Sequence, residues 1–561
     1  MAGVIGIAVG TVVVHLVLGW RYGFDRDELM ALEDARHLAW GYVQYPPMTA
    51  FFGRVALGLF GSSLGGFRLF AALAQAAALV LTGWMAKEMG GGKWAAAVAT
   101  LAGVPFCLGA GGLMQYISFD YLCWALVAWC VVRVAVASVE WRVTSGADKD
   151  QPTGQAAARW WVGVGVGMGL GMMAKYTMGF LVCGMVAGVL FTEMRRYLRS
   201  GWLWLGVALA WAIWLPNLIW EWRRNFVSLE FLKFLHVRDV SEGVTDWFLL
   251  GQAEVTLLAL PLALAGLWFC FVSEEGKRFR ILGWMYAVPL AMFLVMRGRD
   301  YYLAPAYPML YAAGAVWLEG WMGKRRVGSG EWRGDRKSEA GVDRRGIPHC
   351  ADSVRNDVNF FDGGSGGKQE RGIEDGKGKM GNRVRWVRRV IWVCLVLDIL
   401  VAGAVALPVA PVNSGWWRFA SRVDGVFPEE IGWEEFVDGV AHVRDGLPTE
   451  DRGRLGILVG NYGEVGALNL YGEKFGLPQA ISGVNSSWER GYGDPAPEVL
   501  IVVGYPRELL EQEFASCVLA GRTRNRFGVK NEETVEDPDI FVCRGMKRSW
   551  PEFWGRVRKF A

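Results

Sequence analysis

Three carboxylates lie within four residues near the start of the chain, in the segment Asp25-Arg26-Asp27-Glu28. Carboxylates this close repel one another unless a cation, a metal or a proton offsets their charge. Such a cluster is a candidate site for a general base, which removes a proton from a substrate. The simpler interpretation is that the acids only solvate a loop, and the residues alone leave both interpretations open.

Two further acids stand in or beside apolar runs. Asp120, in LMQYISFDYLCWALV, precedes a long apolar run. It is either a partner of the first cluster or an acid favoured by the dipole at a helix N-terminus. Asp398, in LVLDILVAG, lies inside an apolar run, where an acid is a functional candidate by default but can equally pair with a neighbouring helix. We leave Asp398 outside the candidate site.

Several basic residues flank apolar runs in positions that need an explanation. An anionic ligand such as a lipid phosphate or pyrophosphate would account for them, because Arg offers forked donors to phosphate oxygens. Snorkelling toward phospholipid headgroups is the alternative. The residues are Lys175, Arg223, Arg224, Arg297 and Arg299.

Most of these candidate residues lie in or beside predicted membrane spans. Hydrophobic residues make up 53% of the 561 residues and charged residues 20%. That balance is too apolar for one soluble fold of this size. The first run has no basic region before it and no small-x-small cleavage site after it, so we expect a retained helix rather than a signal peptide. About eleven spans are predicted, at 3–20, 67–86, 94–112, 118–138, 160–173, 177–193, 202–219, 247–272, 280–296, 303–321 and 387–410.

Lys and Arg in the short loops predict the orientation of the spans, because cytoplasmic loops are enriched in them. On this basis the N-terminus is cytoplasmic, while the loop 21–66 and residues 411–561 lie outside. The segment 322–386 falls on the cytoplasmic side. It is rich in Gly, Lys, Arg, Asp and Ser without apolar periodicity, which predicts a disordered basic linker. Residues 1–321 then form the multi-span domain, and 387–410 the last transmembrane helix.

Residues 411–561 are predicted to form a small α/β domain. RLGILVG and EVLIVVG are short apolar runs that end in Gly, as buried strands do. WEEFVDGVAHVRDGL and PRELLEQEFASC are predicted helices. Cys517 and Cys543 either form a disulfide in an oxidising compartment or remain free thiols. In the outer loop, residues 28–42 have helical spacing and are predicted to lie flat on the bilayer, before Pro46 and Pro47 bar continuation.

The segment FDRDELMALEDARHLAWGYVQYPPM resembles the first outer loop of bacterial GT-C membrane glycosyltransferases. The most similar group is related to protein O-mannosyltransferases, lipid A aminoarabinose transferases and rhizobial core galacturonosyltransferases. The resemblance continues through SFDYLCWAL, MAKYTMGFL, LPNLIWE and RDYYLAPAYPMLYAAGAVWLE, and resumes at GNYGEVGALNLYGEKFGLPQAISGVNSSW. It covers most of the chain except 322–386. It implies a polytopic α-helical membrane protein of GT-C type with a C-terminal outer α/β domain.

The resemblance also implies a reaction. An inverting glycosyltransferase of this kind moves a sugar from a polyprenyl-phosphate carrier to an acceptor at the outer face of the cytoplasmic membrane. The acceptor is lipid A or core glycan, protein or another envelope glycan, and the other partners are membrane lipids, with no nucleic acid. By the resemblance, Asp27 is the catalytic base, Glu28 its neighbour and Asp120 a second acidic position. The donor phosphate would be held by Lys175, Arg297, Arg299, Tyr301 and Tyr302.

Metal use and acceptor contacts stay open at this level. Some relatives use a divalent metal, which the three adjacent carboxylates are able to bind, and no other cofactor is expected. The segment NYGEVGALNLY supplies Asn461, Tyr462 and Glu464, either as acceptor or domain contacts or simply as a turn after a strand. A transporter or flippase of a lipid-linked sugar is the alternative function. Transporters place charges near the bilayer midplane and often contain repeats, which this sequence does not display.

Overall fold

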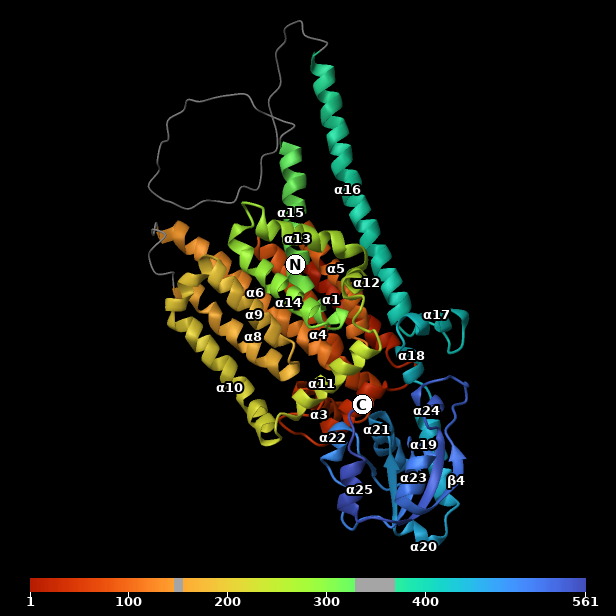
Figure 1. Cartoon of the computed structure of the whole chain (residues 1–561). Helices are drawn as coiled ribbons and strands as arrows, with labels where there is room; N and C mark the ends of the chain where they lie inside the picture. The colour runs from red at the N-terminus through yellow and green to blue at the C-terminus, as the bar shows by residue number, and fades with distance from the viewer. Residues whose placement is uncertain (146–154, 328–368) are drawn as a thin grey trace.

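A bundle of long helices and a small α/β domain at one end of it make up the molecule (Figure 1). The computed structural model describes residues 1–145, 155–327 and 369–561. The C-terminal domain lies beneath the bundle in Figure 1, next to the short helices that follow α1. The side of the bundle that faces this domain carries the candidate site.

Each predicted apolar run is helical. Within the described residues, seven helices are long and apolar enough to cross a membrane, or up to eight if the bent pair Met178–Phe191 and Glu193–Arg199 is one span. The count of eleven spans therefore stays a prediction. The helices in the predicted runs are α1 (Ala2–Leu18), α4 (Leu64–Glu88), α5 (Lys93–Ala110), α6 (Tyr116–Ser145), α8 (Trp160–Ala174), α9 (Met178–Phe191), α10 (Gly201–Arg223), α12 (Phe248–Thr256), α13 (Leu260–Phe271), α14 (Arg280–Val295), α15 (Tyr307–Val327) and α16 (Gln369–Ala406).

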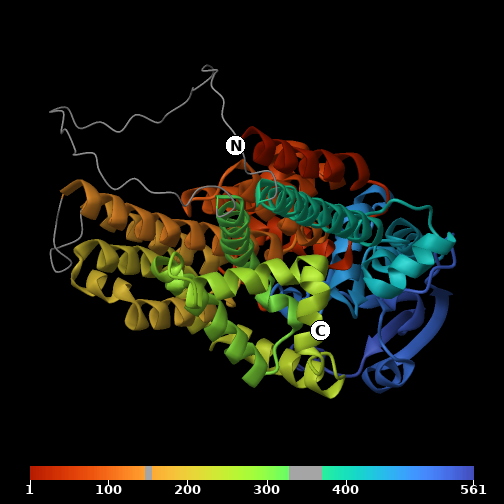
Figure 2. The same cartoon turned by 90° about the horizontal axis from the view of Figure 1, so that it is seen from above.

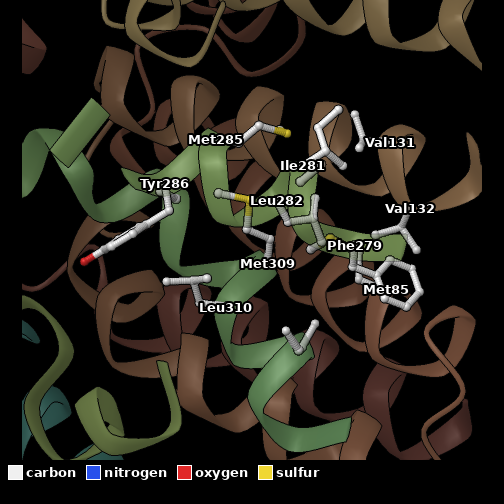
Figure 3. Close-up of a cluster of buried hydrophobic side chains, with 14 of the residues drawn as sticks. Met85, Val131, Val132, Phe279, Ile281, Leu282, Met285, Tyr286, Met309 and Leu310 are labelled. Atoms are coloured by element: carbon white, nitrogen blue, oxygen red, sulfur yellow. The ribbon is translucent and has the colours of Figure 1, made fainter. Parts of the chain in front are cut away.

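The bundle is held by apolar packing and by close contacts at glycine. Figure 3 shows a buried cluster to which α4 supplies Met85, α6 Val131 and Val132, α14 Ile281, Leu282 and Met285, and α15 Met309 and Leu310. α8 and α10 approach through Gly165 and Gly206. A Cβ at Gly165 would lie 2.0 Å from the Gly206 carbonyl oxygen, so no larger residue fits this crossing. α16 lies along the outside of the bundle (Figure 2), with Leu400 and Val401 exposed, as expected for lipid contact.

The structure shortens the predicted linker 322–386 from both ends. α15 continues to Val327, and α16 begins at Gln369, well before the predicted start of the last span at 387. Both ends of the predicted linker, which are rich in basic residues, therefore continue the helices α15 and α16 beyond their apolar segments. The rest of the predicted disordered linker, 328–368, lies outside the described residues.

The C-terminal domain contains a five-stranded sheet with strand order β2-β1-β3-β5-β4. β2, β1 and β3 are parallel, and β5 and β4 add to β3 in antiparallel fashion. The strands are β1 (Leu455–Val459), β2 (Ala480–Ser482), β3 (Val499–Val503), β4 (Phe514–Arg522) and β5 (Asp539–Met546). The helices are α17 (Gly415–Val423), α18 (Val426–Glu429), α19 (Trp433–Asp445), α20 (Thr449–Arg452), α21 (Tyr462–Tyr471), η5 (Gly472–Phe475), α22 (Asn485–Trp488), α23 (Arg507–Glu513), α24 (Glu532–Val535) and α25 (Trp550–Arg556).

Most predicted elements of this domain form, and one boundary is wrong. RLGILVG and EVLIVVG contain β1 and β3, and α19 occupies its predicted segment. The predicted helix PRELLEQEFASC ends at Glu513, because FASC opens strand β4 and pairs with β5. Cys517 faces Cys543 across these two strands, and the two form a disulfide. Tertiary pairing thus overrides the local helical pattern.

Helix α2 (Arg26–Arg36) lies between the bundle and the C-terminal domain instead of flat on a bilayer. The predicted helix 28–42 is shorter, and its apolar face, with Leu29 and Leu32 fully buried, packs in one cluster with residues of α19 and α21. Gly466 of α21 makes this contact close, since a Cβ there would lie 2.4 Å from the Leu29 carbonyl oxygen. Two helices not predicted by hydropathy, α3 (Met48–Phe60) and α11 (Val227–Ser241), complete this side of the bundle.

Candidate active site

Two of the three adjacent acids build the start of α2. Asp25 is the N-cap, and its Oδ1 accepts a hydrogen bond of 2.8 Å from the Asp27 amide. The Glu28 carboxylate accepts in return from the Asp25 amide at 3.0 Å, which completes a capping box. Burial and the neighbouring acids raise the pKa of Asp25 well above its ordinary value. Asp25 is therefore a structural acid in this site.

Glu28 is fully buried against Arg68 of α4. The Arg68 guanidinium donates to both Glu28 oxygens, with Nη2 to Oε2 at 2.5 Å and Nε to Oε1 at 2.9 Å. The Met114 amide donates to the same carboxylate at 2.9 Å. With its oxygens occupied by Arg68 and two amides, Glu28 holds the loop to the bundle. Glu28, which is predicted to be the neighbour of the base, therefore fixes the position of the loop.

Arg68 also joins the bundle to the C-terminal domain. Its Nη2 donates to Glu430 Oε1 at 2.8 Å and its Nη1 to the Gly19 carbonyl at 2.6 Å. One guanidinium thus serves two buried carboxylates. Burial raises the pKa of Glu430 to about 7, in spite of the opposing effect of Arg68. The neighbouring charge of Glu28 raises the pKa of Glu430 further.

Asp27 is the acid that keeps access to open space. Its Oδ1 accepts from the Tyr462 hydroxyl at 3.1 Å and its Oδ2 from Gln115 Nε2 at 3.2 Å. The side chain is half-buried. It lines two cavities of about 600 and 450 Å³, which also share Tyr116 and Arg299 in their walls. The carboxylate is therefore oriented by neutral donors from two directions and lies where two ligands can meet.

Lys175 carries a positive charge into the 450 Å³ cavity. Its Nζ lies 4.2 Å from the ring centre of Tyr302 and 4.9 Å from those of Tyr116 and Tyr301. Ring faces attract a cation within about 6 Å of their centres. Within the part of the chain that the structure describes, Lys175 forms no ion pair with a carboxylate. Its charge is held by aromatic rings and stays available to an anion.

The two predicted arginines of the same segment differ. Arg299 lines both cavities, but a bidentate pair of 2.6 and 2.7 Å joins it to Asp239 of α11. Arg297 pairs with Asp246 at 2.8 Å on the surface and lines neither cavity. The structure brings Arg299, Tyr301 and Tyr302 to the site beside Lys175 and leaves Arg297 outside it.

Asp120 lies behind Lys175 and outside both cavities. Its carboxylate is buried and accepts from Thr177 Oγ1 at 2.8 Å and from Trp124 Nε1 at 3.0 Å. Thr177 is two residues from Lys175, so Asp120 fixes the turn that carries the lysine. The intramembrane Asp398 accepts from the Leu258 amide at 3.0 Å and joins α16 to the bundle.

The predicted contacts of NYGEVGALNLY divide into one site residue and two capping residues. Asn461 is the N-cap of α21, and Glu464 accepts from its amide at 3.0 Å in a second capping box. Burial raises the pKa of Glu464 to about 7. Only Tyr462 reaches the candidate base. The outward Arg224 also has a local explanation, because it pairs with Glu489 of the C-terminal domain at 2.8 Å.

The acidic cluster does not fit a divalent metal. Asp25 caps a helix and Glu28 is neutralised by Arg68, so Asp27 is the one member with access to the cavities. Ca²⁺ and Mg²⁺ sites use several oxygen ligands that converge on the ion. In residues 1–145, 155–327 and 369–561, no three His, Cys, Asp or Glu side chains group in a way that could hold a metal. We derive no step through a metal.

Sequence reasoning missed Arg68 and Gln115, which lie 40 and 88 positions from their partners Glu28 and Asp27. An arginine five residues into an apolar helix, in LGGFRLF, was the available signal for Arg68, since a buried charge needs a partner. Gln115 carries no comparable signal, because a single amide in a loop is ordinary.

Fold and site define a multi-pass membrane protein whose candidate base is covered by an appended domain. A family model of dolichyl-phosphate-mannose-protein mannosyltransferases matches residues 153–220. In structure the chain is similar to ArnT from Cupriavidus metallidurans bound to undecaprenyl phosphate, at TM-score 0.52 and 14% identity over 96% of this chain and 97% of that one. The apo form of that protein aligns at TM-score 0.52 and 14% identity, over 96% and 98%. No curated protein matches the chain in sequence. The chain therefore has the fold of the GT-C membrane glycosyltransferases.

Proposed function

We propose that this protein is an inverting glycosyltransferase that takes a sugar from a polyprenyl-phosphate carrier. The observation that carries the proposal is the position of Asp27 in the walls of two cavities, one of which is also lined by Lys175, a cation held by aromatic rings. A transferase needs two adjoining ligand sites with a base between them. The likeness to ArnT, a protein crystallised with undecaprenyl phosphate, supports the choice of donor.

The chemistry asks for one base and one phosphate-binding cation. Asp27 removes the proton of an acceptor hydroxyl, whose oxygen forms a bond to the anomeric carbon of the donor sugar. The bond from that carbon to the phosphate oxygen breaks, and polyprenyl phosphate leaves. Lys175 offsets the charge that grows on the phosphate, which supports departure without a general acid. Tyr462 and Gln115 keep the Asp27 carboxylate in place.

The same proposal includes the cellular setting. Asp27, Lys175 and the C-terminal domain lie at one end of the bundle, which we assign to the outer face of the cytoplasmic membrane, with the N-terminus in the cytoplasm. A site at the end of the spans supports a transferase over a transporter, which would bind its substrate near the midplane. Membrane lipids surround the bundle.

Release of polyprenyl phosphate from polyprenyl-phosphate sugars by the purified protein tests the proposal. Asp27→Asn keeps the size of the side chain and one of its two acceptor oxygens but removes its basicity, and should lower transfer by at least about 100-fold. Asp246→Asn, at the exposed partner of Arg297, is the matched control and should transfer normally. Full transfer by Asp27→Asn would remove Asp27 from the role of base.

Lys175→Met separates the donor site from the base. Loss of the cation should raise the donor KM by at least about tenfold, since a hydrogen bond to a charged group contributes roughly 1.5–3 kcal/mol. Arg297→Ala should change the donor KM less, because Arg297 lines neither cavity. Equal effects of the two variants would contradict this assignment of the phosphate site.

A further inference from the structure

Two residues that line the cavity of about 600 Å³ beside Asp27 each have a buried side-chain atom with no hydrogen-bond partner among the described residues. These atoms are Nδ1 of His15, a residue 6% exposed, and Oε2 of Glu430, a residue 4% exposed. A buried polar atom left unpaired costs roughly 1–3 kcal/mol. Both residues line the cavity, and a ligand hydroxyl that reaches these atoms would satisfy them.

Glu430 also lines a larger groove, of about 830 Å³, so the groove and the cavity share this residue in their walls. We call this the outer groove. It lies between the C-terminal domain and the loop that follows α1. Its lining includes aromatic rings and carboxylates, among them Tyr22, Trp433, Glu434, Asp438, Tyr471 and Phe475. The basic residues Arg21, Lys474 and Arg526 also line it.

This lining matches the two faces of a sugar ring. The apolar C–H face of a pyranose packs on an aromatic ring, and its hydroxyls donate to carboxylates. Tyr471 and Phe475 are half-buried, so part of each ring stays accessible in the groove. Glu434 and Asp438 are exposed beside them. Asp438 Oδ2 lies 3.4 Å from His442 Nδ1, and both carboxylates remain accessible to the hydroxyls of a ligand.

We infer that the acceptor is a saccharide chain, which lies in the outer groove and passes Glu430 to present a hydroxyl to Asp27. This inference depends on the proposed transferase function and names its acceptor class. The proton of that hydroxyl goes to Asp27, and polyprenyl phosphate leaves as the new glycosidic bond forms.

Photocrosslinking in the full-length protein in its native membranes tests the inference. p-Benzoylphenylalanine replaces Phe475 in the groove or Leu519, an exposed residue of β4 that lines neither space. After irradiation and proteolysis, the peptide with position 475 should carry an adduct that periodate oxidises and whose fragments differ by sugar masses. Position 519 should carry none. Peptide or acyl-chain adducts alone at 475, or no adduct above the level at 519, would overturn the inference.

The Asp27→Asn background separates this inference from the proposed function. There the acceptor binds but does not react, so the saccharide adduct at 475 should be retained or increased. An inactive Asp27→Asn variant with only peptide adducts would refute the saccharide acceptor and leave the transferase standing. A fully active Asp27→Asn variant would instead refute the base, whatever is crosslinked. The mass spectrum of the same adduct also distinguishes a glycolipid from a free oligosaccharide, because only a glycolipid adds acyl fragments.

A kinetic measurement supplies a second criterion. Tyr471→Ala and Asp438→Asn should each raise the KM for a saccharide-bearing membrane extract by about fivefold or more. The value of kcat should change by less than about twofold, because the two residues touch the acceptor away from the reacting atoms. Unchanged KM values in both variants would remove the outer groove from the acceptor path.

Discussion

Replacing Arg68 by Met should destabilise the protein more than any other single change in the candidate site. The variant keeps the apolar stem but removes the guanidinium that serves Glu28, Glu430 and the Gly19 carbonyl. Loss of one partner of a buried ion pair costs about 3–5 kcal/mol, because the other charge stays buried and unpaired. Glu430 has a pKa of about 7 and escapes this cost by taking up a proton. Glu28 therefore sets the magnitude, which should fall in that range.

Thermal unfolding of the full-length protein in lipid nanodiscs measures this effect. A change of 1 kcal/mol shifts Tm by roughly 3 °C in a domain of about 150 residues. Arg68→Met should therefore lower the Tm of the transition that includes the C-terminal domain by at least about 9 °C. Arg224→Met is the matched control. It breaks a more exposed pair with Glu489, for which about 0–1 kcal/mol is expected.

A triple variant separates the buried charge from the loss of side-chain packing. Arg68→Met combined with Glu28→Gln and Glu430→Gln leaves no charge at the site, so its Tm should recover toward the wild-type value. A single Arg68→Met variant that melts within about 2 °C of the wild type would refute the reasoning. So would a triple variant that is no more stable than the single one.

Three other changes have defined outcomes. The pKa of Glu430 is raised from 4.5 to about 7 in the folded state. Protonated Glu430 therefore stabilises the fold fully below about pH 4.5, and this stabilisation is lost as pH rises through 7. Tm should fall between pH 5 and 8, and Glu430→Gln should flatten that fall. Gly466→Ala should lower Tm because its Cβ meets the Leu29 carbonyl, whereas Gly555→Ala, in open space, should not. Tyr462→Phe should reduce kcat about tenfold at unchanged Tm, as measured by polyprenyl phosphate release, because the candidate base loses an orienting donor; wild-type kcat would exclude that role.

Local patterns in the sequence predict the elements but not their mutual contacts. Apolar runs locate the helices of the bundle, and the short runs ending in Gly locate β1 and β3, because hydropathy depends on neighbours along the chain. The sequence predicts α2 on the bilayer, because its apolar face fits a lipid surface and a protein surface equally well. In the fold, α21 covers that face. For the same reason the local pattern predicts a helix through FASC, which instead pairs with β5.

The sequence also does not predict which charged residues reach the site. Arg297 and Arg299 are two residues apart and equivalent by composition, yet only Arg299 lines the cavities. The backbone between them turns, with Arg297 at a positive φ of 49°, and sends the two side chains in different directions. Such a turn in a non-glycine residue is set by tertiary packing, which a sequence pattern does not contain.

Helix geometry explains why three adjacent acids acquire three different roles. Successive residues of a helix point about 100° apart, so Asp27 and Glu28 at the start of α2 cannot face the same partner. Glu28 turns inward to Arg68, while Asp27 turns toward Gln115 and the two cavities. Asp25, before the helix, closes its first turn. The loop therefore places one acid at the cavities and uses the other two to fix it.

The C-terminal domain also helps to position the candidate base, because it supplies Tyr462 to Asp27 and Glu430 to Arg68. Neither contact forms if the domain leaves the bundle. Undocking would release Asp27 from one of its two donors, and would open the wall that the cavity and the outer groove share at Glu430. Asp27 is thus held by both donors only when the surface proposed to bind the acceptor is in place, which would couple acceptor binding to the orientation of the candidate base.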